Sequence, residues 1–387
     1  MPTFQNRQPE LKKLIMDPGS LWNVYGEAGI GKSRLLEEFA NCFQEDPPAL
    51  VLKLDMKQVA NGGADRRERL LRAMIAQAKD WIQGHWTNPE QAAGQIVNQL
   101  NDLTKRMPVL LLCDTTEVLQ ENMDFWRWME AHVVGPLVVE GRVQQVFAGR
   151  VPVPWRRVEV RRALKLMPLT PLSATGAARD LIREVLIQEN SDLEAQESLD
   201  ELLELILTLS FGHPLLSKEL ASFMALRWPT ERSPADVQRM LCQRVVQPIV
   251  KERFFKNVSA PWDEILRLAS VLNWFDATIL QRYLQRVAPT LIEDRSDYFF
   301  IQGITRLRIQ NTVVWREERG DRLHGVIGDI VRHCFQVTEP EAYRQACLAA
   351  AETFAALADE IPGESPEAEP YYQEAESYRQ RAEEMIQ

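Results

Sequence analysis

The feature that most constrains the fold is the stretch GEAGIGKS at residues 26–33. It satisfies the spacing G-x-x-x-x-G-K-[ST], follows the β-type run LWNVY (21–25) and opens a predicted helix. Glycines let backbone N–H groups converge on phosphate oxygens, and the positive end of the helix points at the same place. The sequence therefore predicts a phosphate-binding loop at the end of a strand.

Side chains within this loop are expected to act on a nucleotide. Lys32 would place a positive charge between the β- and γ-phosphates, and the Ser33 hydroxyl would ligate Mg²⁺. The nucleotide-binding residues predicted in and beside the loop are Gly26, Glu27, Ala28, Gly29, Ile30, Gly31, Lys32, Ser33 and Arg34.

Two later β-type runs end in charged residues. PVLLLCD (108–114) is apolar at successive positions, which is typical of a strand buried on both faces, and it ends in Asp114, the predicted second magnesium ligand. Glu117 is expected to polarise the attacking water. VFAGR ends in Arg150, which would sense the γ-phosphate if both strands flank the strand before the loop. Surface acids and a solvated arginine are the ordinary alternatives.

The order of segments predicts the architecture. Through residues 1–170, β-type runs alternate with helical patterns, which favours a parallel sheet covered by helices; the runs are 21–25, 50–56, 108–114, 143–149 and 158–166. This α/β P-loop domain is expected to be followed by an α-helical lid domain at 171–234, a winged-helix domain at 235–337 and an acidic helical hairpin at 338–387. The winged-helix hairpin would pair RLRIQN (306–311) with TVVWREE (312–318) or its neighbour.

Composition limits the class of protein. Of the 387 residues 45% are hydrophobic, yet no apolar run is long enough for a membrane span, and the N-terminus lacks a signal-peptide core. Five scattered cysteines suit a reducing compartment, so a cytoplasmic protein with no membrane partner is expected. Residues 339–387 carry twelve acids and three bases, most of the net charge of -10. This tail is either a solvated face or a docking surface for a protein partner.

In combination, these motifs resemble the STAND class of P-loop ATPases, which includes NACHT and NB-ARC domains. GEAGIGKS, LLLCDTTE and VFAGR are similar to its P-loop, Walker B and sensor segments. FQNRQPELKKL resembles its F-x-G-R-x-x-E-L segment, with Asn6 in place of glycine, which implies that Phe4 and Arg7 lie near the nucleotide.

Two later segments extend this resemblance. SFGHPLL is similar to the G-x-P signature of the lid, which implies that Pro214 touches the adenine; a proline at a helix start is also ordinary structure. RLHGVIGDIV resembles the MHD motif, which implies that His324 holds the ADP β-phosphate, although Gly325 replaces the aspartate. A core histidine is the alternative.

The resemblance implies a slow ATPase that acts as a molecular switch, with ATP/ADP and Mg²⁺ as cofactors. ADP would hold a closed resting form, and ATP would drive opening and self-association. Partners would supply effector and sensor functions, and the chain would act as an adaptor or hub in prokaryotic antiviral defence or signalling.

Two other functions stay open. An AAA+ initiator-like ATPase that binds DNA has the same domain order, and the basic stretch 142–165 keeps it in play. Against it, residues 251–332 carry thirteen bases and eleven acids, a weak electrostatic footprint for phosphates, so nucleic acid is not favoured. The third is a scaffold that binds nucleotide without hydrolysis.

Overall fold

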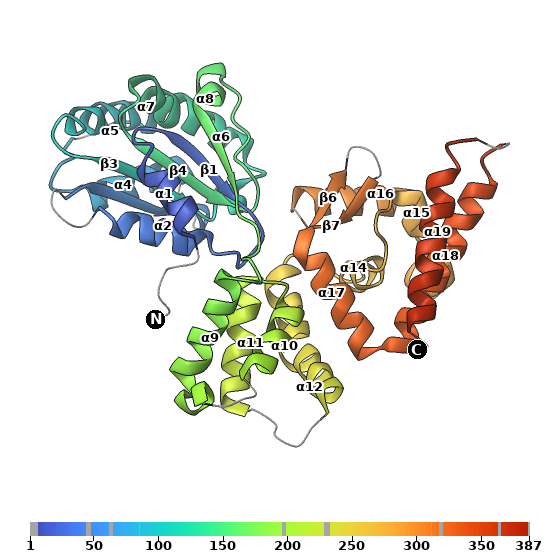
Figure 1. The fold of residues 1–387 in the computed structure, drawn as a ribbon. Coiled ribbons are helices and arrows are strands. Elements are labelled where there is room, and N and C mark those ends of the chain that lie inside the picture. Colours follow the sequence, from blue (N-terminus) through green and yellow to red (C-terminus); the bar gives the residue numbers. More distant parts are fainter. Residues whose placement is uncertain are drawn as a thin grey trace. The chain divides into compact units, whose positions relative to one another are not determined.

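The computed structural model describes residues 7–43, 48–61, 65–84, 86–195, 199–227, 233–310, 312–316, 320–362 and 365–385. Phe4 lies outside these residues. The chain divides into two compact units, Met1–Thr170 and Pro171–Gln387 (Figure 1). Each unit has a separate architecture and is described by itself.

A parallel sheet forms the centre of the first unit. Within the described residues it has five strands in the order β2-β3-β4-β1-β5, with bounds β1 Leu21–Tyr25, β2 Leu50–Asp55, β3 Val109–Asp114, β4 Gln144–Gly149 and β5 Leu164–Pro168. Every strand pair is parallel, so the carboxyl ends meet at one edge. This confirms the predicted α/β core with a parallel sheet.

Helices cover both faces of this sheet (Figure 1); they are α1 Gln8–Ile15, α2 Lys32–Asn41, α3 Met56–Ala60, α4 Arg66–Gln77, α5 Pro89–Leu103, α6 Met123–Met129, α7 Gly135–Glu140 and α8 Val158–Ala163. Alternate residues of β3 enter different apolar cores. Leu110 and Leu112 pack with α2, while Leu111 and Cys113 pack in the core that includes α5. The prediction that this strand is buried on both faces is confirmed.

One predicted strand is partly wrong. The run 158–166 begins as helix α8, and the chain joins the sheet only at Leu164, which pairs with Leu21. Val160 is the buried residue of α8, whereas Arg161 and Arg162 are exposed. Arginine is a good helix former, and a helix with one apolar contact is compatible with this composition.

The second unit is mainly helical; its helices are α9 Ala177–Glu189, α10 Leu199–Ser210, α11 Pro214–Arg227, α12 Pro234–Leu241, α13 Gln247–Ile249, α14 Trp262–Ala269, α15 Ala277–Val287, α16 Asp297–Ile309, α17 Gly325–Thr338, α18 Pro340–Asp359 and α19 Glu369–Glu384. The helical path of α12 continues through α13 to Phe254, with π-helical turns at Cys242–Val246 and Val250–Phe254. The last two helices pack along one another (Figure 1).

The β-hairpin of this unit does not use RLRIQN, the strand that both predicted pairings contained. Val313–Arg316 (β6) pairs antiparallel with Gly320–Leu323 (β7), so β6 pairs with its later neighbour. RLRIQN is not a strand, because residues 306–309 end α16. The buried residues Phe300, Ile304 and Leu307 recur at helical spacing, and this period decides the conformation.

Two general findings concern cysteines and membrane segments. Cys113, Cys242, Cys334 and Cys347 are buried thiols and Cys42 is exposed. No helix among the described residues combines the length and apolar character that crossing a bilayer requires.

Candidate nucleotide-binding site

The phosphate-binding loop is tied to the strands around it. Gly26 donates from its backbone N to the carbonyl oxygen of Gly149 at 3.3 Å. Its φ is +154°, and a Cβ there would lie 2.7 Å from the carbonyl oxygen of Leu169. Glycine is therefore required at the start of the loop, both for conformation and for space. Gly31, with φ +103°, begins α2 without a side-chain cap.

Lys32 lies inside the loop. Its side chain is buried, and Nζ donates to the carbonyl oxygens of Gly26 and Glu27, each at 2.7 Å. Burial lowers the pKa of Lys32 to about 8, and the positive charge of Arg150 acts in the same direction. The carboxylates of Glu117, Asp114 and Glu27 act in the opposite direction and oppose this lowering of the pKa. All the charges predicted around a γ-phosphate in the first unit thus act on one ammonium group.

The acids after β3 lie on a strained turn. Asp114 Oδ1 accepts from the backbone N of Thr115 at 2.7 Å, and Thr115 has a φ of +60°. Glu117 follows in a short helical turn, Thr116–Leu119. Its Oε1 lies 3.9 Å from Arg150 Nε, and its buried Oε2 has no hydrogen-bond partner among the described residues. An acceptor oxygen is therefore available beside Arg150.

The sheet order corrects one detail of the prediction. β4 pairs with β1, but β3 does not, because β4 lies between them. Arg150 therefore follows the strand next to the loop, while Asp114 ends the strand beyond it and Glu117 follows that strand. The two acids still reach the site because all the strands end at the same edge.

A close contact between Thr116 and Gly149 was not predicted. A Cβ on Gly149 would lie 2.1 Å from Thr116 Oγ1, so the end of β4 and the turn with Glu117 meet without space for a side chain. Thr116 is buried. The glycine directly before Arg150 was the available sequence signal.

The side chain of Arg7 contacts the loop at its backbone. Its buried guanidinium donates to the carbonyl oxygens of Ile30 at 3.1 Å and Thr170 at 2.5 Å, and it forms an ion pair with Glu10 at 3.1 Å. These contacts hold the loop and were not predicted.

Arg34 points along its own helix, where it pairs with Glu37 at 3.1 Å and Glu38 at 2.5 Å. The arrangement does not place its guanidinium among the charges that act on Lys32.

Pro214 and His324 belong to the second unit, so their contact with a nucleotide stays a prediction. Pro214 starts α11, and the preceding Gly212 (φ +71°) accepts from Leu172 N at 2.9 Å. His324 donates from its backbone N to Thr312 O at 2.9 Å and precedes α17. Gly325 has a φ of +35°, which explains physically why glycine suits the position of the expected aspartate.

The oxygen donors at the site fit Mg²⁺. Ser33 offers an exposed hydroxyl and Asp114 a carboxylate, and the unpartnered Oε2 of Glu117 could accept from a bound water. Mg²⁺ prefers oxygen ligands and keeps several waters. No group of three or more His, Cys, Asp or Glu suited to a metal occurs in the described parts of the chain.

Comparison with known proteins gives distant structural neighbours only. No protein-family model and no curated protein matches the chain. Similar solved structures include a STAND protein with a tetratricopeptide repeat sensor from Pyrococcus horikoshii (15% identity, TM-score 0.41, 99% of this chain and 48% of that one). This chain thus spans about half the length of that protein.

Two further solved structures are similar to this chain at low identity. Cdc6p from Pyrobaculum aerophilum has 13% identity and a TM-score of 0.43, covering 88% of this chain and 96% of that one. AMPPCP-bound DnaA from Aquifex aeolicus has 14% identity and a TM-score of 0.39, covering 87% and 96%. At such scores these likenesses do not define a function for this chain.

Proposed function

We propose that this chain is a slow ATPase that acts as an ATP/ADP-dependent switch. The observation that carries the proposal is the position of Lys32 inside the glycine loop, with Asp114, Glu117 and Arg150 acting on its charge. A buried ammonium ion that donates only to loop carbonyls can exchange these partners for phosphate oxygens, which carry more negative charge. The same loop presents the N-terminus of α2 to an anion.

The residues then have separate roles. Lys32 and the loop amides bind the β- and γ-phosphates, and Ser33 and Asp114 hold Mg²⁺, which would neutralise developing charge on the phosphates. Glu117 orients and deprotonates the attacking water through its unpartnered oxygen. Arg150, which follows the strand beside the loop, contacts the γ-phosphate. Its ion pair with Glu117 would weaken when ATP is bound.

The switch itself requires contacts that differ between the two nucleotide states. We assign Pro214 of a helical lid (171–234) to the adenine and His324 of a winged-helix domain (235–337) to the ADP β-phosphate. ADP then favours a closed form, and ATP favours an open form that self-associates. The acidic tail at 338–387 is the proposed docking surface for a protein partner, and a role in prokaryotic defence or signalling rests on the resemblance alone.

Nucleotide analysis of the purified protein tests this proposal. We expect co-purified ADP, and a higher mass in light scattering with a slowly hydrolysed ATP analogue than with ADP. The Lys32→Ala variant should lose both properties, while Lys57→Ala, on an exposed side chain of α3, should keep them. A protein without nucleotide affinity, or with the same mass in both nucleotides, would refute the switch.

Binding to DNA is the second candidate, and the surface of α8 favours it. Arg161 and Arg162 are exposed on α8, and Arg156 is exposed just before it. Val158, at the start of α8, and Leu166 of β5 are apolar side chains exposed by 58% and 52%. Clustered arginines suit a phosphate backbone, whereas the balanced charge of residues 251–332 does not.

A salt titration separates the two functions. If the chain binds duplex DNA, its affinity should fall steeply between 50 and 200 mM salt, and Arg161→Gln with Arg162→Gln should flatten the slope. Without detectable binding at 50 mM salt the initiator-like function is rejected, and the switch proposal is unaffected.

A further inference from the structure

A second polar cavity lies in the helical unit, away from the glycine loop in sequence. Its volume is about 330 Å³, and its walls come from the end of α14, from β7, from the first turn of α17 and from α19. The charged residues that line it are Arg322, Arg332, Arg381, Asp329 and Glu374. Among the described lining residues, bases therefore outnumber acids by one.

Arg332 and Arg381 come from different helices and converge on the same region. Burial raises the pKa of Cys347 to about 11, and the positive charges of both arginines oppose this rise. Both guanidinium groups thus act on one buried thiol of α18. Positive charges on the walls of one cavity repel each other, and a ligand whose negative oxygens contact both guanidinium groups offsets this repulsion.

Both arginines retain hydrogen-bonding capacity. Arg381 donates to the carbonyl oxygen of Val271 at 3.3 Å and to Asn273 Oδ1 at 2.8 Å, both neutral acceptors. Arg332 donates to Asp329 Oδ1 at 2.5 Å. A guanidinium group carries five N–H donors, so each arginine can also bind an oxyanion.

The first turn of α17 adds a backbone donor to the same wall. Gly325 and Gly328 line the cavity. Gly328 N already donates to the carbonyl oxygen of His324 at 3.2 Å, so the backbone donor on this wall is the N–H of Gly325 at the start of the helix. The helix has fourteen residues, and its N-terminus has neither a side-chain cap nor an acidic residue in the first turn. The N-terminal end of a helix favours anions, so it acts in the same direction as the arginines.

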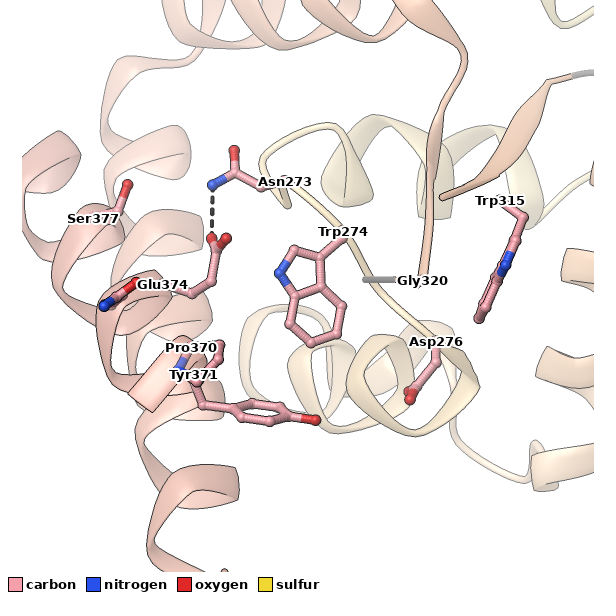
Figure 2. Close-up of a pocket in the computed structure, with 10 residues that line it drawn as sticks. Asn273, Trp274, Asp276, Trp315, Gly320, Pro370, Tyr371, Glu374 and Ser377 are labelled. Carbon is pink, nitrogen blue, oxygen red and sulfur yellow. Dashed lines mark hydrogen bonds between the residues drawn. The ribbon is translucent and has the colours of Figure 1, made fainter. Parts of the chain in front are cut away.

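The acids of the cavity are already engaged on its border. Figure 2 shows Glu374 and Asn273 directed toward one another, and Asn273 Nδ2 donates to Glu374 Oε2 at 2.7 Å. These two residues also line a neighbouring cavity of about 500 Å³ with Trp274, Tyr371 and Asp276 (Figure 2). No basic residue is among the described residues lining that neighbour, so of these two adjoining cavities the arginine-lined one favours an anion.

We propose that this cavity binds a phosphate group, presented as free phosphate or as the phosphomonoester of a small molecule. Arg332 and Arg381 bind its oxygens, and Gly325 at the start of α17 donates its backbone N–H. The ligand joins α17, which follows His324, to α19. Any effect of this ligand on the choice between the ADP and ATP states rests on the proposed switch. The binding of phosphate to the cavity does not depend on that switch.

The test uses the full chain with Lys32→Ala, which removes anion binding at the glycine loop. Orthophosphate, glycerol phosphate and acetate are titrated at constant ionic strength by calorimetry, with the thermal midpoint as a second readout. We expect both phosphates to bind and acetate to bind at least tenfold more weakly. If orthophosphate binds but glycerol phosphate does not, a phosphomonoester is rejected as the ligand. If acetate binds as tightly as the two phosphates, the assignment of the cavity to phosphate is rejected.

Arginine variants locate the site. Arg381→Gln and Arg332→Gln should each raise the dissociation constant for phosphate at least tenfold, and Arg379→Gln, an exposed arginine on the same helix, should leave it unchanged. Circular dichroism checks that each variant folds. If Arg381→Gln does not fold, the phosphate affinity of Arg332→Gln tests the site. Equal affinity in a folded Arg332→Gln variant, or no phosphate binding by the parent, overturns the proposal. If wild type does not bind nucleotide but the Lys32→Ala chain still binds phosphate, only the switch proposal is overturned.

Discussion

Glu117 follows strand β3 and Arg150 follows strand β4, yet Oε1 of the glutamate lies 3.9 Å from Nε of the arginine. The pair places the acid that we propose for water activation beside the cation that we propose for the γ-phosphate, and both belong to the first unit. Its other carboxylate oxygen is buried without a hydrogen-bond partner among the described residues. This geometry makes Glu117 the first residue to test.

Glu117→Gln should slow ATP hydrolysis by about 10² or more, because an amide cannot accept the proton of the attacking water. ATP binding should persist, so the variant should accumulate in the associated form, measured by sedimentation with excess ATP. Glu121→Gln, an exposed acid nearby, is the control. If turnover and sedimentation both match wild type, the chain is instead a non-hydrolysing scaffold.

Gly149→Ala should impair turnover at least tenfold, because its Cβ would lie 2.1 Å from Thr116 Oγ1 and displace the turn that carries Glu117. The double variant Gly149→Ala/Thr116→Ala removes that hydroxyl and should recover most of the activity. Steady-state ATPase rates of the two single variants and the double variant measure the coupling. Additive losses would show that the contact does not position Glu117.

Arg7→Met should destabilise the first unit by about 2 to 3 kcal/mol, because the buried carbonyls of Ile30 and Thr170 lose a charged donor. ADP affinity should fall with it, since the loop is less ordered. Urea denaturation and calorimetry with ADP measure the two effects, with the exposed Arg72→Met as the control. Weaker ADP binding at unchanged stability would indicate direct contact with the nucleotide instead.

The ionisation of Lys32 predicts a dependence of stability on pH. Its pKa is lowered from 10.5 to about 8, so between these values the unfolded chain binds more protons at this residue than the folded protein does. The contribution to the free energy of unfolding therefore rises with pH in that window. Urea denaturation should show wild type gaining stability relative to Lys32→Met from pH 8 to pH 10, and no change from pH 6 to 7. A relative loss above pH 8 would refute the pKa shift.

His324→Ala should weaken ADP binding about tenfold and leave binding of an ATP analogue nearly unchanged, because the proposed contact forms only in the ADP state. Calorimetry with both nucleotides measures the difference. His333→Ala is the control, since that histidine lies later on α17 and bonds to Gln238. ADP affinity equal to wild type would remove His324 from the site.

Local patterns predicted the parts of the fold that depend on neighbours in sequence. GEAGIGKS places a strand, a loop and a helix by spacing alone, and LLLCD predicts a strand buried on both faces. The strand prediction for RLRIQN was wrong because a short alternation of apolar residues is compatible with both the strand period and the helix period. The buried residues Phe300 and Ile304, upstream of this segment, continue a helical period into it.

Contacts between distant residues carry no spacing signal. Neither the Arg7 bond to Ile30 nor the approach of Thr116 to Gly149 follows from a motif. The order of the strands is also set by packing, which is why β4 rather than β3 lies beside β1. The arginine-lined cavity collects residues from four segments and could be recognised only in three dimensions.

The guanidinium of Arg7 has a mechanical consequence. Arg7 and Thr170 are 163 positions apart, yet one side chain connects the carbonyl of Ile30 in the loop to the carbonyl of the last residue of the first unit. A displacement of Ile30 on phosphate binding must therefore stretch this link or pull Thr170 with it. Arg7 thus links the glycine loop directly to the residue that precedes the second unit.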